Sequence, residues 1–372
     1  MIARPTLKDV AEAAGVSAMT VSLSLRNSPR ISQSTRDKVG KAATKLGYQV
    51  NPFAATLVSF RTSTNPKFQA TLALLNCFHS PTEWRQYAAF TKFYEGAVDR
   101  ASELGYSIEE FWVNDPSLTA ERLRRTLSAR GIPGIIMAFL EEGHQSVDKL
   151  HAFDFSGFAC VTLGWRINDL NIHSASNDQF HAASLATQKL VDLGYQRIGL
   201  LLNEKTDEAL EHRYRGGFLI HQMQFPASRR VPIFEASELT RKTFLNWVKK
   251  NRVDAVLAAP AGLHLWLEED GYSIPKDIGF AYLERATPGG ALAGIDQNDR
   301  LVGSAAVDVV VAHLHRNEYG ISPFQKSTLI QGEWFEGWSV RKAGSPQIQS
   351  SPTSTGEKRV KSAAPKRQRS NA

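Results

Sequence analysis

The first fifty residues carry an apolar pattern of helical period. Apolar side chains recur three and four positions apart, on one face of a helix, at Leu7, Val10, Ala11 and Ala14. Gly15 is suited to end this helix, and Ser17 and Ser32 are suited to begin two more. In those helices we expect core positions at Val21, Leu25, Val39, Ala42, Ala43 and Leu46. The pattern predicts a small all-α unit that contains a helix-turn-helix.

From about residue 69 the pattern changes to short, continuous apolar runs that alternate with helical stretches. The runs predict strands at residues 70–75, 107–113, 134–138, 158–163, 197–202, 255–258, 279–283 and 327–331. Strands that are apolar throughout and separated by helices indicate parallel sheets covered on both faces. The body of the chain is therefore expected to be an α/β structure.

The length of this body, residues 69–342, predicts two lobes. We place the first lobe at about residues 69–174 plus 301–324 and the second at about residues 175–300 plus 325–342. The segment 293–298, with the helix 302–316, would form a return crossover between them. Ligands of open parallel sheets bind beyond the carboxyl ends of the strands. We therefore expect a ligand cleft where those ends of the two lobes meet.

The net charge of +7 is concentrated at the two ends of the chain. Residues 1–61 hold nine Lys and Arg against three Asp and Glu, and residues 341–372 hold eight against one. A basic module on an acidic body favours a polyanionic partner. Residues 343–372 are rich in Ser, Pro, Thr, Lys and Arg, so we expect a disordered basic tail, with an extra contact to DNA as the alternative.

The helix-turn-helix favours DNA as that partner, because the second helix of such a motif enters the major groove. Its outward positions are Ala18, Met19, Ser22 and Leu23. The alternative is a trio of helices that caps the larger body. Further along, residues 52–60 can form a helix, but about nine residues are marginal for a helix alone in water. We expect this helix to order only on DNA or against a partner subunit.

Four motifs in this region resemble the lactose-repressor/galactose-repressor family. They are T-L-K-D-V-A-E-A-A-G-V-S at residues 6–17, T-V-S at 20–22, S-x-x-T-R at 32–36 and L-G-Y-x-x-N-P at 46–52. The resemblance implies a DNA-binding headpiece at residues 1–49 and a hinge helix at residues 50–61. It further implies a homodimer on a palindromic double-stranded DNA operator, acting in this family most often as a repressor.

The resemblance also implies roles for single residues. Ala18, Met19 and Leu23 would read bases, and Leu57 would be a wedge inserted into the minor groove. A larger set would lie near phosphates: Ser17, Thr20, Ser22, Arg30, Ser32, Thr35 and Asn51. Thr6, which begins the first helix, is placed at the same interface. The family often has Arg where this chain has Leu23, and Leu cannot read guanine through paired hydrogen bonds, so we expect a different operator.

The body resembles the sensor domain of the same family, itself similar to periplasmic sugar-binding proteins. The motifs are E-L-G-Y (103–106), D-L-G-Y-Q-R-I-G (192–199), R-x-x-G (213–216) and Y-S-I-P-K-D-I-G-F (272–280). The resemblance implies a cleft for a sugar or sugar derivative, contacted by Phe90, Trp165, Arg213 and Glu284. The alternatives are two core aromatic residues and a surface ion pair of Arg213. Residues 259–261 are Ala-Pro-Ala where the family usually has an Asn-Asp pair, which favours an unusual effector or a weak response to sugars.

Other classes of function receive less support from the sequence. The motifs G-x-S-x-G, H-E-x-x-H, G-x-x-x-x-G-K-[S/T] and C-x-x-C do not occur, so we expect no catalytic residue, cofactor or metal. The sequence has no run of about 18 apolar residues and no apolar leader, which predicts a cytoplasmic, nucleoid-associated protein. Cys77 and Cys160 stand in apolar runs and predict buried free thiols. A sugar-binding module without a DNA role is the main alternative, and a sugar-acting enzyme is a remote one.

Overall fold

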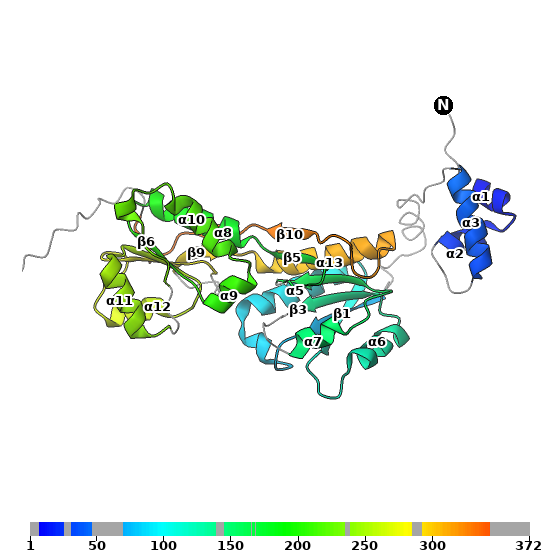
Figure 1. Cartoon of the computed structure of the whole chain (residues 1–372), viewed down its shortest axis with the longest axis horizontal. Helices are drawn as coiled ribbons and strands as arrows, with labels where there is room; N and C mark the ends of the chain where they lie inside the picture. Colours follow the sequence, from blue (N-terminus) through cyan, green and yellow to red (C-terminus); the bar gives the residue numbers. More distant parts are fainter. Residues whose placement is uncertain are drawn as a thin grey trace, which may run out of the picture.

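The computed structural model in Figure 1 describes residues 7–25, 31–46, 70–138, 145–164, 166–167, 169–234, 239–284 and 292–342. The predicted hinge helix and basic tail lie outside these ranges. Three helices form the amino-terminal unit, α1 (Leu7–Ala14), α2 (Ala18–Leu25) and α3 (Gln33–Leu46). They have a core of their own, made of Val10, Ala11, Ala14, Val21, Val39 and Ala43 with the partly buried Leu7, Val16 and Ala42.

Local hydrogen bonds explain where these helices begin and end. Gly15 has a φ of 59°, a left-handed conformation that glycine adopts without strain, and it follows the last residue of α1. Ser17 Oγ accepts the Thr20 N–H at 3.1 Å, and Ser32 Oγ accepts the Thr35 N–H at 3.3 Å. Both serines thus cap the helices that follow, as predicted. Leu46 corrects an expectation: it ends α3 with 37% of its surface exposed and is not part of the core.

The first lobe is built on a six-stranded sheet of order β10-β5-β4-β3-β1-β2, in which every pairing is parallel. The strands are β1 (Ala70–Asn76), β2 (Tyr106–Trp112), β3 (Gly134–Ala138), β4 (Ala159–Leu163), β5 (His173–Asn177) and β10 (Ser327–Ile330). Successive side chains of a strand face opposite sides. Leu72 and Leu74 therefore pack with α5 (Ala88–Glu103) and α13 (Asp299–Arg316). Ala73 and Leu75 pack on the other face with α6 (Ala120–Ala129) and α7 (Gln145–His151). A short 3-10 helix, η1 (Glu83–Gln86), precedes α5.

The second lobe is built on a five-stranded sheet of order β11-β9-β8-β7-β6. Its strands are β6 (Ile198–Leu201), β7 (Ala255–Ala258), β8 (Gly279–Tyr282), β9 (Ala293–Asp296) and β11 (Glu333–Phe335). One face packs against α8 (Gln179–Asp192) and α10 (Arg213–Gln222), and the other against α11 (Arg241–Asn251) and α12 (Leu263–Glu269). The short elements α9 (Glu204–Ala209) and η2 (Ala227–Arg229) complete the lobe. The described helices include none with the length and apolar character needed to cross a bilayer.

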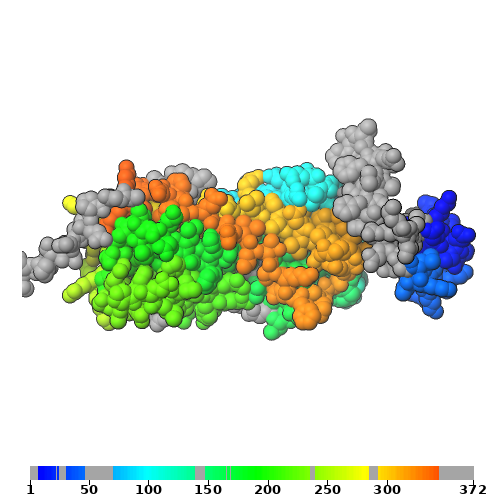
Figure 2. All heavy atoms as spheres, turned by 90° about the horizontal axis from the view of Figure 1, so that it is seen from above, coloured from blue at the N-terminus to red at the C-terminus, as the bar shows by residue number. Residues whose placement is uncertain are grey.

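Four features of the sheets differ from the sequence-based expectation. Residues 325–342 were placed in the second lobe, but β10 pairs with β5 in the first lobe and only β11 joins the second. The strand β5 was not predicted, and the segment expected as a crossover contains the strand β9. β11 is also antiparallel to β9. The predicted lobe boundary is wrong because only two residues separate β10 from β11. The chain crosses from the first lobe to the second in this short connection, without a helix that would mark the crossing in the sequence. Figure 2 shows this carboxy-terminal part, in orange, on the surface of both lobes.

The chain passes between the lobes at three points, which hydrogen-bond to one another. Asn177 donates from Nδ2 to the Gln297 carbonyl at 2.9 Å, and the Asp178 N–H donates to the Ile330 carbonyl at 2.8 Å. Asn298 donates from Nδ2 to the Gln331 carbonyl at 2.9 Å. These bonds join the segments after β5, before α13 and after β10 into one junction between the lobes.

Candidate DNA-binding surface and ligand pocket

The outer side of α2 carries an exposed apolar residue. Met19 is 74% exposed, Ala18 is exposed as well, and Leu23 is half-buried, whereas Val21 of the same helix is fully buried in the headpiece core. One side of α2 is thus anchored in the headpiece core through Val21, and the side with Ala18 and Met19 is free to contact a partner. Met19 and Leu23 are therefore not sealed inside the protein, which a mere capping role would require.

The amino-terminal ends of α2 and α3 have the same hydroxyl arrangement. Ser17 Oγ lies 2.9 Å from Thr20 Oγ1, and Ser32 Oγ lies 2.8 Å from Thr35 Oγ1. A helix start with hydroxyls and backbone N–H groups is a favourable place for a phosphate. The structure thus brings four of the predicted phosphate contacts to two helix starts. Of the other predicted DNA contacts, Thr6, Arg30, Asn51, Leu57 and the side chain of Ser22 lie outside the described residues.

A pocket opens at the carboxyl ends of strands from the first lobe, against the second lobe. Its cavity volume is about 20 Å³, room for about one water molecule, so a larger ligand would have to displace a side chain of the wall or move the lobes apart. Gly164 and Arg166 follow β4, Ser176 lies near the end of β5, and the second lobe contributes the turn between α9 and α10. The full lining is Gly164, Arg166, Ser176, Gln179, Ala209, Leu210, Glu211 and Arg213. This is the location that the parallel-sheet argument predicts.

Two arginines from different lobes bind one carboxylate in this pocket. Arg166 Nη1 of the first lobe lies 2.7 Å from Glu211 Oε1, and Arg213 Nη2 of the second lobe lies 2.9 Å from Glu211 Oε2. Arg166 also donates from Nη2 to Ser327 Oγ of β10 at 2.8 Å. Burial raises the pKa of Glu211, but Arg213 and Arg166 lower it by more, so the net shift is downward and the carboxylate stays ionised. The arrangement is an ion-pair bridge between the lobes.

A buried carboxylate binds residues of the turn that carries Glu211 and fixes the conformation of this turn. Glu211 and His212 both have left-handed backbone, with φ of 54° and 56°. Asp207, whose side chain is buried, binds His212 Nδ1 at 2.9 Å and Arg215 Nε at 2.8 Å. Its backbone carbonyl accepts the His212 N–H at 2.8 Å. Non-glycine residues adopt this conformation only when their surroundings fix it, and Asp207 supplies that fixation.

The four residues predicted to bind an effector have different surroundings. Arg213 lines the pocket. Phe90 lies in an aromatic cluster, with ring centroids 6.1 Å from Phe78 and 5.5 Å from Tyr87. Glu284 is an exposed residue whose carboxylate accepts a hydrogen bond from Tyr214, and Trp165 lies outside the described residues. The sequence reasoning missed Arg166 and Glu211. Arg166 could have been found as a charged residue just beyond the carboxyl end of a predicted strand, whereas no sequence signal marks Glu211.

A buried polar network lies at the junction of the lobes. Tyr214 donates its hydroxyl to Glu284 Oε1 at 2.7 Å and accepts from Gln297 Nε2 at 3.0 Å. Desolvation of the carboxyl group raises the pKa of Glu284, although the residue remains partly exposed and the bond from Tyr214 opposes the rise. Burial also raises the pKa of Asp299 to about 6, against the lowering effect of Lys92 at 3.9 Å and of the bond from Asn177. These carboxyl groups are part of the junction between the lobes.

Within the described ranges, His, Cys, Asp and Glu form no cluster that could hold a metal ion. Cys77 and Cys160 are buried free thiols, and burial raises the pKa of both. This state makes either thiol a poor nucleophile at neutral pH.

Comparison with known proteins gives matches over both parts of the chain. The family model described as "Bacterial regulatory proteins, lacI family" matches residues 6–51. The model "Periplasmic binding proteins and sugar binding domain of LacI family" matches residues 70–225. The transcriptional regulator MalR of Staphylococcus xylosus is 24% identical over 345 residues, which cover 88% of this chain and 97% of MalR. The regulator CelR of Thermobifida fusca is 27% identical over 292 residues, which cover 74% of this chain and 80% of CelR.

Solved structures of similar proteins share the fold. The complex of the regulator CelR with cellobiose has a TM-score of 0.54 at 19% identity, over 90% of this chain and all of that one. The lac repressor dimer bound to operator and the anti-inducer ONPF has a TM-score of 0.53 at 22% identity, over 91% of this chain and all of that one. The headpiece, the two mainly parallel sheets and the matched family models together lead to one assignment. The chain belongs to the LacI family of bacterial regulatory proteins.

Proposed function

We propose that this protein is a sequence-specific DNA-binding transcription regulator, most simply a repressor, whose affinity for its operator depends on a small molecule in the pocket between the lobes. The observation that carries this proposal is the exposed Met19 on a capped second helix, beside helix starts suited to phosphate. A homodimer would place two such helices in successive major grooves of a palindromic site. Acting on chromosomal DNA, the protein would work in the cytoplasm.

The described side chains favour a particular mode of base reading. Among the predicted base-reading side chains, Met19 is 74% exposed and Leu23 is half-buried. Neither offers a strong hydrogen-bond donor or acceptor to a base edge, so both are suited to thymine methyl groups. Ser17, Thr20, Ser32 and Thr35 would fix the position of the helix through phosphates. Specificity would then depend partly on apolar contacts and on DNA shape.

The pocket supports a small polar ligand. Arg213, Ser176 and Gln179 offer donors and acceptors at its wall, and the CelR relative has been solved with cellobiose. A sugar or sugar derivative is therefore our proposal for the class of effector, with Arg213 in contact with it. The relatives named above are transcription regulators, and we infer a regulatory role without catalysis.

Selection of genomic fragments by the purified protein, followed by sequencing, tests the proposal. A palindromic consensus should emerge, and a gel shift with it should show a complex. Met19→Ala should weaken binding to that site by roughly tenfold while leaving binding to random DNA almost unchanged, because an apolar base contact is worth about 1–2 kcal/mol.

Leu46→Ala is the matched control, because it truncates another exposed apolar residue of the headpiece on a different helix. It should leave operator binding close to that of the wild type. A protein that retains no fragment above background would be a solute-binding module without a DNA role, and the proposal would then be wrong.

A further inference from the structure

The geometry points to an anionic effector: a small polar molecule whose carboxylate or phosphate group replaces Glu211 between Arg166 and Arg213. This inference rests on the proposed function and adds the chemical class of the ligand. The observation behind it is the position of one carboxylate between two guanidinium groups that belong to different lobes.

The charges of the pocket wall favour an anion. Among the residues that line it, Arg166 and Arg213 are positive and only Glu211 is negative. The two arginine side chains are 29% and 27% exposed, so most of their surface has been removed from water. Guanidinium groups in such partly dry places bind oxyanions through charge-assisted hydrogen bonds that neutral hydroxyls do not match. A neutral sugar that displaced Glu211 would leave both guanidinium groups without a counter-ion.

Glu211 occupies the place that an external oxyanion would take. Each of its two oxygens binds a different arginine, and its own side chain is 45% exposed at the mouth of the pocket. It is attached to a left-handed turn of two non-glycine residues, which costs free energy to maintain. A partly exposed ion pair contributes little stability. Displacement of Glu211 by a ligand therefore costs little free energy, because both arginines then have the oxyanion of the ligand as their partner.

The rest of the wall fits the remainder of such a ligand. Ser176 and Gln179 supply a hydroxyl and an amide on the first-lobe side and at the start of α8. Groups of this kind bind the hydroxyls of a carbohydrate in either direction, as donor or acceptor. Sugar acids and sugar phosphates combine both features. The shared chemistry is an oxyanion on a polyhydroxylated skeleton.

Titration calorimetry on the full chain, at constant ionic strength, separates these ligands. The probes are D-glucose, D-glucuronate, D-glucose 6-phosphate and inorganic phosphate, so that the three carbohydrates share a pyranose ring and differ in charge. We expect at least one charged carbohydrate to bind roughly tenfold more tightly than glucose. Whichever of the two charged carbohydrates binds more tightly identifies a carboxylate or a phosphate as the source of the oxyanion. Glucose binding as tightly as both charged forms would overturn the inference.

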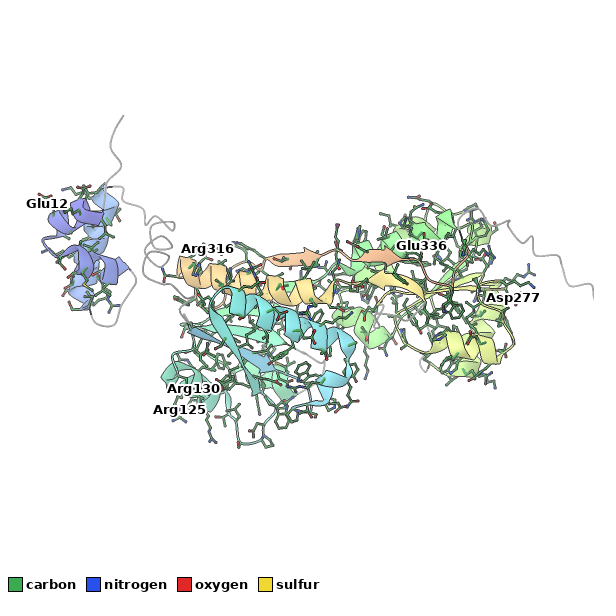
Figure 3. All side chains as sticks on the ribbon, turned by 180° about the vertical axis from the view of Figure 1, so that it is seen from behind. Glu12, Arg125, Arg130, Asp277, Arg316 and Glu336 are labelled. Atoms are coloured by element: carbon green, nitrogen blue, oxygen red, sulfur yellow. The ribbon has the colours of Figure 1, made fainter. Side chains whose placement is uncertain are left out.

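Three variants locate the site. Glu211→Gln removes the competing carboxylate and should tighten phosphate binding by roughly fivefold or more, whereas Arg166→Gln and Arg213→Gln should abolish the preference for anions. The control is Glu109→Gln, since Glu109 forms a similar pair with Arg130 at 2.5 Å, on the side of the first lobe away from the second (Figure 3). It should leave phosphate binding unchanged. A Glu211→Gln protein that binds phosphate no better than the wild type would refute the inference.

Gel shifts on the same preparations keep the two proposals apart. If the protein binds its operator and responds only to neutral sugars, the anion inference alone is wrong. If it binds anions at Arg166 and Arg213 but no DNA, the regulatory proposal is wrong and the ligand class stands.

Discussion

Two adjacent glycines in α10 provide a controlled test of how the second lobe is packed. Gly216 and Gly217 both lie inside this helix, so alanine at either position gains up to about 1 kcal/mol of helix propensity. Their surroundings differ. A Cβ at Gly216 would lie 3.5 Å from a ring carbon of Phe180, an ordinary contact distance. A Cβ at Gly217 would lie 2.2 Å from the backbone oxygen of Phe180 and 3.1 Å from the Cβ of Ala183.

The difference in free energy of unfolding follows from these distances. A backbone oxygen cannot rotate away, so α8 and α10 must separate by roughly 1 Å to admit the methyl group at position 217. Overpacking of this kind costs about 1–3 kcal/mol. Gly216→Ala should therefore be neutral or more stable than the wild type by up to about 1 kcal/mol. Gly217→Ala should be less stable than Gly216→Ala by about 2 kcal/mol or more.

Urea unfolding followed by tryptophan fluorescence measures this difference, because Trp247 and Trp266 pack against the core of the second lobe. α10 begins at Arg213, so Gly217→Ala should also weaken ligand binding in the pocket. Equal midpoints for the two variants would refute the packing argument, because propensity alone treats both glycines alike.

Three further predictions concern the junction between the lobes and the binding of DNA. The pKa of Asp299 is about 6 in the folded protein, against 3.8 ordinarily, so the folded state holds its proton over a wider range. The contribution of Asp299 to the free energy of unfolding should therefore fall as pH rises from 4 to 6, by up to about 3 kcal/mol, and Asp299→Asn should remove this contribution in pH-dependent urea unfolding. Leu57→Ala should weaken binding to the operator more than binding to random DNA in gel shifts, and equal losses would exclude the wedge. The logarithm of operator affinity should fall linearly with the logarithm of salt concentration, and a flat plot would contradict phosphate contacts at α2 and α3.

The apolar pattern was sufficient to predict most strands and helices, and it failed at β5 for a physical reason. The sequence of β5, His-Ser-Ala-Ser-Asn, is polar, yet all five residues are buried. Their polar groups are satisfied by neighbours: Ser174 Oγ donates to Ser327 Oγ at 3.0 Å, and His173 Nδ1 accepts the Lys326 N–H at 2.9 Å. Polar residues can be buried when their hydrogen bonds are satisfied, and a strand made of them has no hydrophobic periodicity. An analysis of hydrophobic patterns therefore cannot detect this strand.

The pocket shows a second limit of sequence reasoning. Arg213 could be predicted because it stands in a motif, and the capped helices of the headpiece could be predicted because a cap acts within three residues. The pairing of Arg166 with Glu211 joins two lobes across 45 positions of the chain. Neither residue has a periodicity or a motif of its own that specifies this partner. Only the arrangement of the two lobes brings them together.

The weakness of the Arg166–Glu211 pair decides what can regulate the angle between the lobes. A partly exposed ion pair contributes about 1 kcal/mol or less, which is too little to hold one arrangement of the lobes against another. A ligand changes DNA affinity only through its differential affinity for the two arrangements, commonly 1–3 kcal/mol. A ligand bound by both arginines contacts the first lobe through Arg166 and the second through Arg213, so any rotation about the hydrogen-bonded junction would break one of these contacts. The bridge formed by Glu211 is therefore better suited to shape the pocket than to fix the angle between the lobes, and the ligand itself must supply the energy that selects one arrangement of the lobes.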